Sequence, residues 1–146
     1  MSDAPKKLTF DVTARRIDAH GSVATCKSAE IRLDTDLEGT PDAFNPAELL
    51  LAALSACIIK GIERVTPMLG LQIRGVTVEV HGVRQDAPPK MERIDYLILV
   101  DSDEPDRRLA LLHDNVKKYG TVFNTVAPGT SLQGELRRAP ADGSGD

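Results

Sequence analysis

The chain has two cysteines, Cys26 and Cys57, and Cys57 is the residue with the most suggestive chemistry. A thiolate is a nucleophile that attacks electrophiles and can be oxidised to a sulfenic acid. Cys57 lies in a run of Leu and Ala residues, where a free cysteine also packs well as a small hydrophobic residue. A structural role for Cys57 therefore stays open beside a reactive one.

Activation of Cys57 would require a neighbouring cation. The residue comes 12 positions after Asn45, the expected start of a helix, and lies beyond the turn in which a helix N-terminus stabilises a thiolate. Lys60 is one helical turn further on, and Arg15 and Arg16 end the first predicted strand. All three are candidates, although each also fits a solvated surface position.

Glu48 has two possible roles. It precedes Cys57 by nine residues, which on a regular helix means about 180° around the axis and about 13 Å along it, so the two cannot touch within one helix. A catalytic role would need Glu48 to point into the pocket of a partner subunit. The order Asn45, Pro46, Glu48 is also typical of a capped helix N-terminus, and we favour that role.

Other chemistries find little support. His20, His81 and His113 show no metal-ligand spacing with each other or with cysteine. The acidic run 101–106 lacks the length and glycine of a calcium loop, and there is no glycine-rich phosphate loop or serine elbow. We expect no metal and no cofactor.

Alternating apolar and polar residues predict strands in the first part of the chain. Leu8, Phe10, Val12 and Ala14 share one face of the first strand, and a turn follows at Asp18 to Gly21. In the next alternating run, Cys26 has the opposite parity to the apolar residues, which are Val23, Ala29, Ile31 and Leu33. This places Cys26 off the core face. The stretch from Leu37 to Asn45 reads as a loop.

A helix is predicted from Asn45 to about Val65, before Pro67 and Gly70. It is apolar on nearly every side, which predicts a buried helix. Ala53, Cys57 and Gly61 recur every four residues and form a smooth stripe. Because a short chain has few elements to cover this helix, we expect a homodimer in which two such helices cross.

The remaining elements are two strands, a helix and a last strand. Ile73 to Val83 and Arg93 to Val100 form a predicted hairpin with a longer loop. A second helix follows Asp103-Glu104-Pro105 and ends at Gly120, with a stripe formed by Leu109, Leu112, Val116 and Tyr119. A final strand is expected from Thr130 to Arg138.

Composition sets the class of protein. The 146 residues fit one α+β domain over 1–138, followed by a disordered tail over 139–146. A net charge of −4 gives no reason to bind nucleic acid or anionic membranes. The longest apolar stretch, Leu49 to Ile59, is too short to span a bilayer. We expect a cytoplasmic protein with reduced thiols.

Two segments resemble the OsmC/Ohr family. Residues 46–57 (PAELLLAALSAC) are similar to the helix of that family that carries its reactive cysteine, and residues 118–125 (KYGTVFNT) are similar to the segment that carries its second cysteine. The order of elements agrees as well, so the resemblance spans most of residues 7–138. It implies antiparallel sheets packed around a buried central helix and an intertwined homodimer.

The resemblance also implies a peroxidase. Cys57 would attack an organic hydroperoxide, with Glu48, Arg15 and Arg16 as the other candidate site residues. The family's second cysteine falls on Gly120, so an external thiol reductant would have to resolve the sulfenic acid. Gly120 also has a simple explanation, since glycine commonly follows a helix end. Glu48 is shifted by one position from the acidic residue of the Ohr branch.

Two functions remain open at this stage. The first is a thiol-dependent peroxidase that reduces organic hydroperoxides through Cys57 in oxidative-stress defence. The second is a non-catalytic protein of the same fold that binds a small apolar ligand at the dimer interface, so whether the chain is an enzyme stays undecided. Cys26 is a candidate to replace the missing second cysteine, although its parity argues against this.

Overall fold

The computed structural model describes residues 7–140 and divides the chain into two compact units, Met1–Leu49 and Leu50–Asp146. The elements are of both kinds, as the predicted α+β class requires. Most of the predicted C-terminal tail, 139–146, lies outside the described residues. The assignment of 1–138 to one domain stays a prediction, and the two units are described one at a time.

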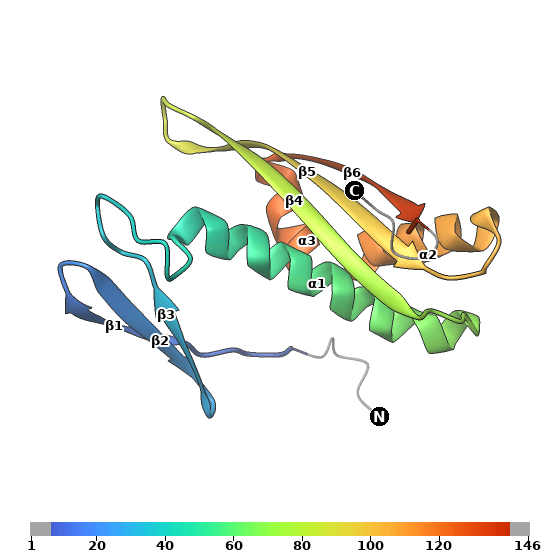
Figure 1. Cartoon of the computed structure of the whole chain (residues 1–146), viewed down its shortest axis with the longest axis horizontal. Helices are drawn as coiled ribbons and strands as arrows, with labels where there is room; N and C mark the ends of the chain where they lie inside the picture. Colours follow the sequence, from blue (N-terminus) through green and yellow to red (C-terminus); the bar gives the residue numbers. More distant parts are fainter. Residues whose placement is uncertain (1–6, 141–146) are drawn as a thin grey trace. The chain divides into compact units, whose positions relative to one another are not determined.

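The first unit carries a three-stranded antiparallel sheet. Its strands are β1 (Thr13–Asp18), β2 (Gly21–Cys26) and β3 (Ala29–Leu33), in the order β1-β2-β3 (Figure 1). The turn at Asp18 to Gly21 is confirmed. The strand expected from Leu8 begins only at Thr13, which pairs with Thr25 near the end of β2. Among residues 7–140, no strand pairs with residues 8–12.

A two-residue turn at Lys27 and Ser28 separates β2 from β3, where the sequence had suggested one continuous run. Lys27 adopts a positive φ of 56°, which is uncommon for a non-glycine residue. Because of this turn Cys26 pairs directly with Ala29, and the two side chains point to the same face of the sheet. The prediction that Cys26 lies off the apolar face was therefore wrong.

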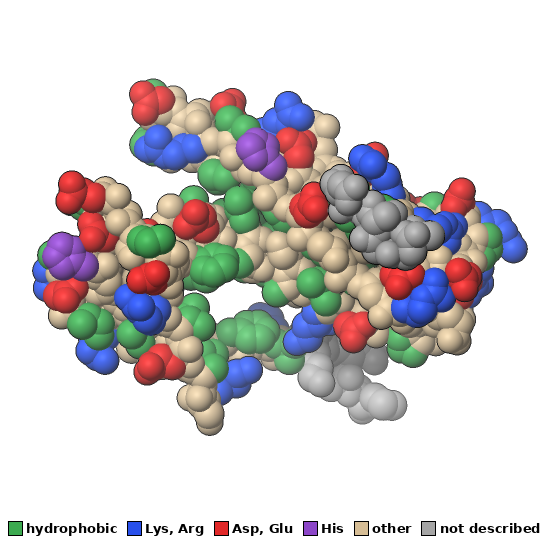
Figure 2. Space-filling model, viewed as in Figure 1, with side chains coloured by type: hydrophobic (Ala, Val, Ile, Leu, Met, Phe, Trp, Pro, Cys, Tyr) green, Lys and Arg blue, Asp and Glu red, His purple; other side chains and the backbone are tan. Residues whose placement is uncertain are grey.

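The register places most of the small and apolar side chains of this sheet on one face. Paired residues point to the same face and neighbours along a strand alternate, so that face carries Ala14, Arg16, Ser22, Ala24, Cys26, Ala29, Ile31 and Leu33. Ile31 is 47% exposed, and hydrophobic side chains reach the surface of this unit in Figure 2. The face is not fully covered within the single chain.

Helix α1 (Pro46–Leu69) begins where the sequence predicts and ends later. It continues through Pro67, because a proline in the last turn removes only one backbone hydrogen bond. Gly70, at φ 63°, closes the helix, with Gly70 N donating to Pro67 O and Leu71 N donating to Thr66 O. This is a Schellman motif, which satisfies the last carbonyl groups.

The second unit carries a mixed sheet of three strands, β4 (Gly75–Gln85), β5 (Lys90–Asp101) and β6 (Ser131–Arg138). The predicted hairpin is confirmed as β4 and β5, which pair antiparallel. Strand β6 pairs parallel to β5, so the expectation of purely antiparallel sheets was wrong here. The parallel pair is possible because a long crossover connection returns the chain to the starting end of the sheet.

The crossover contains α2 (Asp106–Tyr119), α3 (Thr121–Val126) and the short 3-10 helix η1 (Ala127–Gly129). The predicted stripe of α2 is confirmed for its first three residues, which are buried, but Tyr119 is 52% exposed. The phenol keeps its polar tip in water, and Lys118 Nζ lies 5.3 Å from its ring centre. Phe123 of α3 supplies the buried aromatic residue instead.

One aliphatic core joins α1, α2 and β5. Its fully buried members are Leu54, Ile58, Ile62, Ile94, Ile98, Val100 and Leu112. Gly61 lets α2 approach α1, since a β-carbon placed there would lie 3.6 Å from Val116. Part of the small-residue stripe expected to meet a second copy is thus covered by α2 of the same chain.

Burial on every side of α1 is not observed in the single chain. Ala53, Ala56 and Ile59 are exposed. Within residues 7–140, none of the helices has the length and apolar character needed to cross a membrane.

Candidate functional site

The Cys57 thiol lies against the junction between α2 and α3. A β-carbon placed on Gly120 would lie 3.0 Å from Cys57 Sγ, so the sulfur rests against the backbone of Gly120. Cys57 is partly buried and packs against the edge of the aliphatic core. A partly buried thiol keeps some access to small molecules, which a fully enclosed one would lack.

Gly120 is not required by its backbone conformation. Gly120 does follow the end of α2, but its φ of −75° and ψ of 122° are open to any residue, so ending the helix does not require a glycine. Space is the constraint: a β-carbon would come within 3.0 Å of Phe123 Cβ and 3.3 Å of Val116 O as well as close to Cys57. A side chain at position 120 would therefore press on the thiol.

Glu48 caps α1. Asn45 N donates to Glu48 Oε1 over 2.9 Å, and Glu48 N donates to Asn45 Oδ1 over 2.8 Å. These two bonds form a capping box, as the sequence predicted. A further catalytic role for Glu48 stays a prediction.

The two candidate arginines lie on opposite faces of the first sheet. Arg15 pairs with Val23 and Arg16 with Ser22; of the two, only Arg16 shares the face that carries Ala24 and Ile31. Both belong to the first unit and Cys57 belongs to the second. Their role beside Cys57 therefore stays a prediction.

A buried tyrosine and a half-buried histidine form a second polar cluster that sequence reasoning missed. Tyr96 Oη and His113 Nε2 are 2.7 Å apart, and Tyr96 is 4% exposed. Gly134 makes room for the phenol, since a β-carbon there would lie 2.4 Å from the ring. In β5, Tyr96 alternates in step with the buried Ile94 and Ile98, and a buried phenol needs a partner. The sequence offered no way to identify His113 as that partner.

Burial controls the charge of both groups. It raises the pKa of Tyr96 to about 12, so the phenol is neutral at ordinary pH. Burial also lowers the pKa of His113, and the charge of Lys117 adds to this effect. The pair is neutral near pH 7, and Phe123 packs edge-on against Tyr96 with ring centres 5.9 Å apart.

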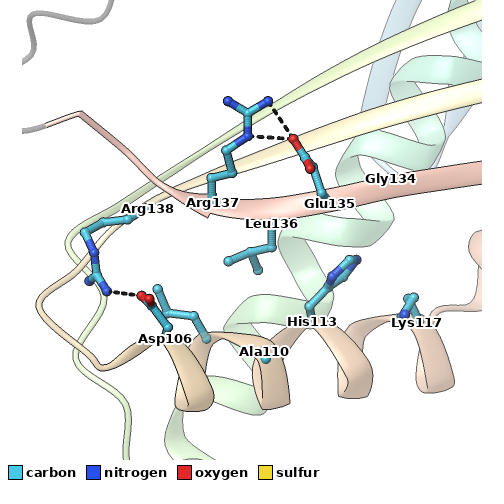
Figure 3. A pocket seen from close by; sticks show the side chains of 10 residues that line it. Asp106, Ala110, His113, Lys117, Gly134, Glu135, Leu136, Arg137 and Arg138 are labelled. Atoms are coloured by element: carbon cyan, nitrogen blue, oxygen red, sulfur yellow. Dashed lines mark hydrogen bonds and ion pairs between the residues drawn. The ribbon is translucent and has the colours of Figure 1, made fainter.

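His113 also lines a cavity of about 560 Å³ between α2 and β6 (Figure 3). The cavity lies wholly within the second unit. Among residues 7–140, no three His, Cys, Asp or Glu side chains are placed to hold a metal ion together.

Comparison with known proteins places these features in a family. The family model described as OsmC-like protein matches residues 39–135, which is more than half of the chain. No curated protein matches the sequence.

Solved structures share the fold. An OsmC-like protein from Mycoplasma pneumoniae is 20% identical, with a TM-score of 0.85, and the match covers 92% of this chain and 100% of that one. An organic hydroperoxide resistance protein from Elizabethkingia anophelis, with thiocyanate bound, is 15% identical, with a TM-score of 0.72 and coverage of 92% and 99%. The organic hydroperoxide resistance protein OhrB of Bacillus subtilis is 19% identical, with a TM-score of 0.59 and coverage of 89% and 98%.

The family match includes both Cys57 and the Gly120 against which its sulfur rests, and the structural matches extend over nearly the whole chain. This chain belongs to the OsmC-like protein family.

Proposed function

We propose that this protein is a thiol-dependent peroxidase that reduces organic hydroperoxides through Cys57 in defence against oxidative stress. The observation that carries the proposal is the contact between Cys57 Sγ and Gly120, the position that matches the family's second cysteine. The names of the Elizabethkingia and Bacillus neighbours, which are organic hydroperoxide resistance proteins, support this substrate class.

The reaction has two stages. The Cys57 thiolate attacks the O–O bond of the hydroperoxide: an S–O bond forms, the O–O bond breaks, and the alkoxide leaves and takes up a proton to become the alcohol. The sulfur, now oxidised by two electrons, is a sulfenic acid. An external thiol then displaces water to form a mixed disulfide, and a second thiol releases Cys57 in its reduced form.

The external thiol is needed because Gly120 has no sulfur to offer. Cys26, the other candidate for this role, belongs to the first unit, and Cys57 belongs to the second. Cys26 shares the apolar face of its sheet with Arg16, so the argument that it lies off the core face no longer speaks against it. We keep the external thiol as the proposed reductant.

The active form in this proposal is an intertwined homodimer with α1 at its centre. The apolar face of the β1–β3 sheet and the exposed Ala53, Ala56 and Ile59 of α1 are the surfaces that a second copy would cover. A sheet face that turns toward the partner would carry Arg16 with it and leave Arg15 on the outside. Arg16 is therefore the proposed activating cation of Cys57.

The decisive experiment measures consumption of cumene hydroperoxide with dihydrolipoamide as the reductant. Native protein and Cys26→Ser should turn over, whereas Cys57→Ser should not. Arg16→Gln should lower kcat/KM roughly tenfold to a hundredfold, as expected when a charged hydrogen-bond donor to a thiolate is lost, and Arg15→Gln should leave it unchanged. Equal turnover by native protein and Cys57→Ser would refute the proposal.

The absence of a thiol at Gly120 favours one alternative, a non-catalytic protein that binds a small apolar ligand at the dimer interface. In that case Cys57→Ser would retain ligand binding, and native protein would show no peroxide consumption above the variant.

A further inference from the structure

The cavity between α2 and β6 is built along one stripe of α2. Asp106, Ala110, His113 and Lys117 recur at intervals of four, three and four residues, so they share one side of the helix. Figure 3 shows this side turned toward β6, with Leu136 pointing down into the space between them. Helix α2 and strand β6 together form a groove, and neither Cys57 nor Gly120 lines it.

Most charges around the groove are already paired. Arg137 Nε donates to Glu135 Oε1 over 2.6 Å, and Figure 3 shows both side chains on the side of β6 that faces away from α2. Arg138 donates to Asp106 Oδ1 over 2.8 Å and to Ser102 O, which closes the groove at the start of α2. These four side chains leave no net charge in the groove.

Lys117 forms the loosest of these ion pairs. Its Nζ is 3.7 Å from Asp114 Oδ1, with side chains that are 45% and 71% exposed, so this ion pair is weak. Of the two residues only Lys117 lines the groove, so its ammonium group is the charge that a ligand would meet at the end opposite the Arg138–Asp106 pair.

His113 adds a neutral donor beside that charge. Tyr96 Oη and His113 Nε2 share this hydrogen bond, in which either group can be the donor. We assign the neutral phenol as the donor, and this assignment places the ring proton of His113 on Nδ1. Within residues 7–140, Nδ1 has no hydrogen-bond partner. The phenol thus fixes the ring in the groove with an unused N–H.

The wall next to these donors is apolar. Leu109 and Ala110 of α2 and Leu136 of β6 line it. Leu109 and Ala110 precede His113 by four and three residues, which is about one turn of the helix. The seven residues from Ala110 to Lys117 correspond to about 10 Å along the helix axis. A cavity of about 560 Å³ lies within the usual range for small-molecule sites.

We propose that the groove between α2 and β6 binds an aliphatic carboxylate of medium chain length. The carboxylate lies between Lys117 Nζ and His113 Nδ1, which supply a charged and a neutral donor. The hydrocarbon chain follows Leu109, Ala110 and Leu136 toward the closed end. This site is separate from Cys57 and does not depend on the proposed peroxidase activity.

Octanoate is the probe for this site, titrated into the full-length protein labelled with nitrogen-15. Amide signals of α2 and β6 around His113, Lys117 and Leu136 should shift in a saturable way. Lys117→Ala should raise the dissociation constant roughly tenfold, since a charge-assisted contact is lost. Lys118→Ala is the matched control and should bind like native protein, because Lys118 does not line the groove.

Two further measurements distinguish specific binding of octanoate in this groove from nonspecific binding to apolar surface. Ala110→Leu should abolish the shifts by filling the groove while leaving every charged group in place, and octanol should bind at least tenfold more weakly than octanoate. The proposal is overturned if octanoate shifts signals around Cys57 or β1–β3 instead. Equal binding by native protein, Lys117→Ala and Ala110→Leu would overturn it as well.

Discussion

At the scale of single residues, the contact between Cys57 and Gly120 is the feature with the most consequences. The sulfur rests on a backbone position, and no side chain intervenes. The short distance between position 120 and Cys57 Sγ determines whether a side chain introduced there can bond to the thiol. Glycine is needed at this position because there is little space, whereas its φ of −75° can be adopted by any residue.

Gly120→Cys should form a disulfide with Cys57. A β-carbon at position 120 would lie 3.0 Å from Cys57 Sγ, and an S–S bond of about 2.04 Å places the opposite β-carbon at roughly this distance. Thiol titration of the denatured, oxidised variant should find Cys26 alone, and the mass should fall by two hydrogens.

Gly120→Ala is the control for this variant. It should keep both native thiols free and show only a modest loss of stability from the crowding by Phe123 and Val116. Three free thiols in Gly120→Cys after mild oxidation would contradict the geometry.

His113 should make stability depend on pH. Its pKa lies below 6.5 in the folded protein because of burial and Lys117, so the unfolded chain takes up the proton first as pH falls. The free energy of unfolding contributed by neutral His113 is present above pH 6.5 and is lost as pH falls toward the folded pKa. Denaturant unfolding at about pH 8 and about pH 5 measures this loss.

His113→Gln isolates the effect, because the amide still accepts from Tyr96 and does not titrate. The native protein should lose more stability between the two pH values than the variant loses. His20 has a raised pKa from its bond to Asp36 and gives the opposite trend, but it is present in both proteins and cancels. Equal losses would contradict the assignment.

The residues of the Cys57 site were predictable to different degrees. The sequence singled out Cys57 by its helix, and the family resemblance aligned Gly120 with a neighbour of the thiol. The Tyr96–His113 pair was not predictable, because it joins a strand and a helix 17 residues apart without any recurring spacing. Such a pair depends on the packing of α2 on the sheet, which no local pattern encodes.

At the scale of elements, the boundaries of α1 show what local sequence decides. Its start follows from Asn45, Pro46 and Glu48, whose hydrogen bonds are local and were predicted. Its end was placed too early at about Val65, because Pro67 was taken as a stop. A proline in a last turn is tolerated, and the positive φ of Gly70 sets the true end.

Substitutions in the cap separate the two roles of Glu48. Asn45→Ala should lower the free energy of unfolding by about 1 kcal/mol, whereas Glu48→Gln should cost less, since a glutamine still completes a capping box. If Glu48 only caps α1, peroxidase activity per folded protein stays unchanged in Glu48→Gln. A loss of activity with intact stability would instead assign Glu48 a catalytic role.

The strands were predicted correctly where both partners alternate clearly between apolar and polar residues. They were misplaced where the turn between them has no recognisable sequence signature. The β4–β5 hairpin was recovered, although β4 lies two residues later than predicted and β5 is longer at both ends. The turn between β2 and β3 uses Lys27 and Ser28, which lack the Asn-Gly or Asp-Gly signature of a two-residue hairpin. Missing that turn reversed the face assigned to Cys26.

At the scale of the whole molecule, the uncovered face of the β1–β3 sheet determines the expected assembly. A three-stranded sheet needs a covered apolar face for stability, and this one leaves Ile31 47% exposed. A second copy supplies that cover in our proposal.

Ile31→Glu should therefore convert a dimer into a monomer in light scattering at micromolar concentration, because it places a charge on the proposed interface. Thr25→Glu introduces the same charge on the opposite face of the sheet and should remain dimeric. A native protein that scatters as a monomer would remove the basis for the dimeric active form.

The parallel pairing of β6 with β5 also has a consequence during synthesis of the chain. The hairpin of β4 and β5 can close as soon as Asp101 is free, whereas β6 is the last strand and arrives only after the whole α2–α3 crossover. Cys57 is synthesised before Gly120, so the contact between the two residues can form only after Gly120 has been added. Until Gly120 has been made and has packed against α1, the Cys57 thiol of a nascent chain lacks the cover that Gly120 gives it in the folded protein.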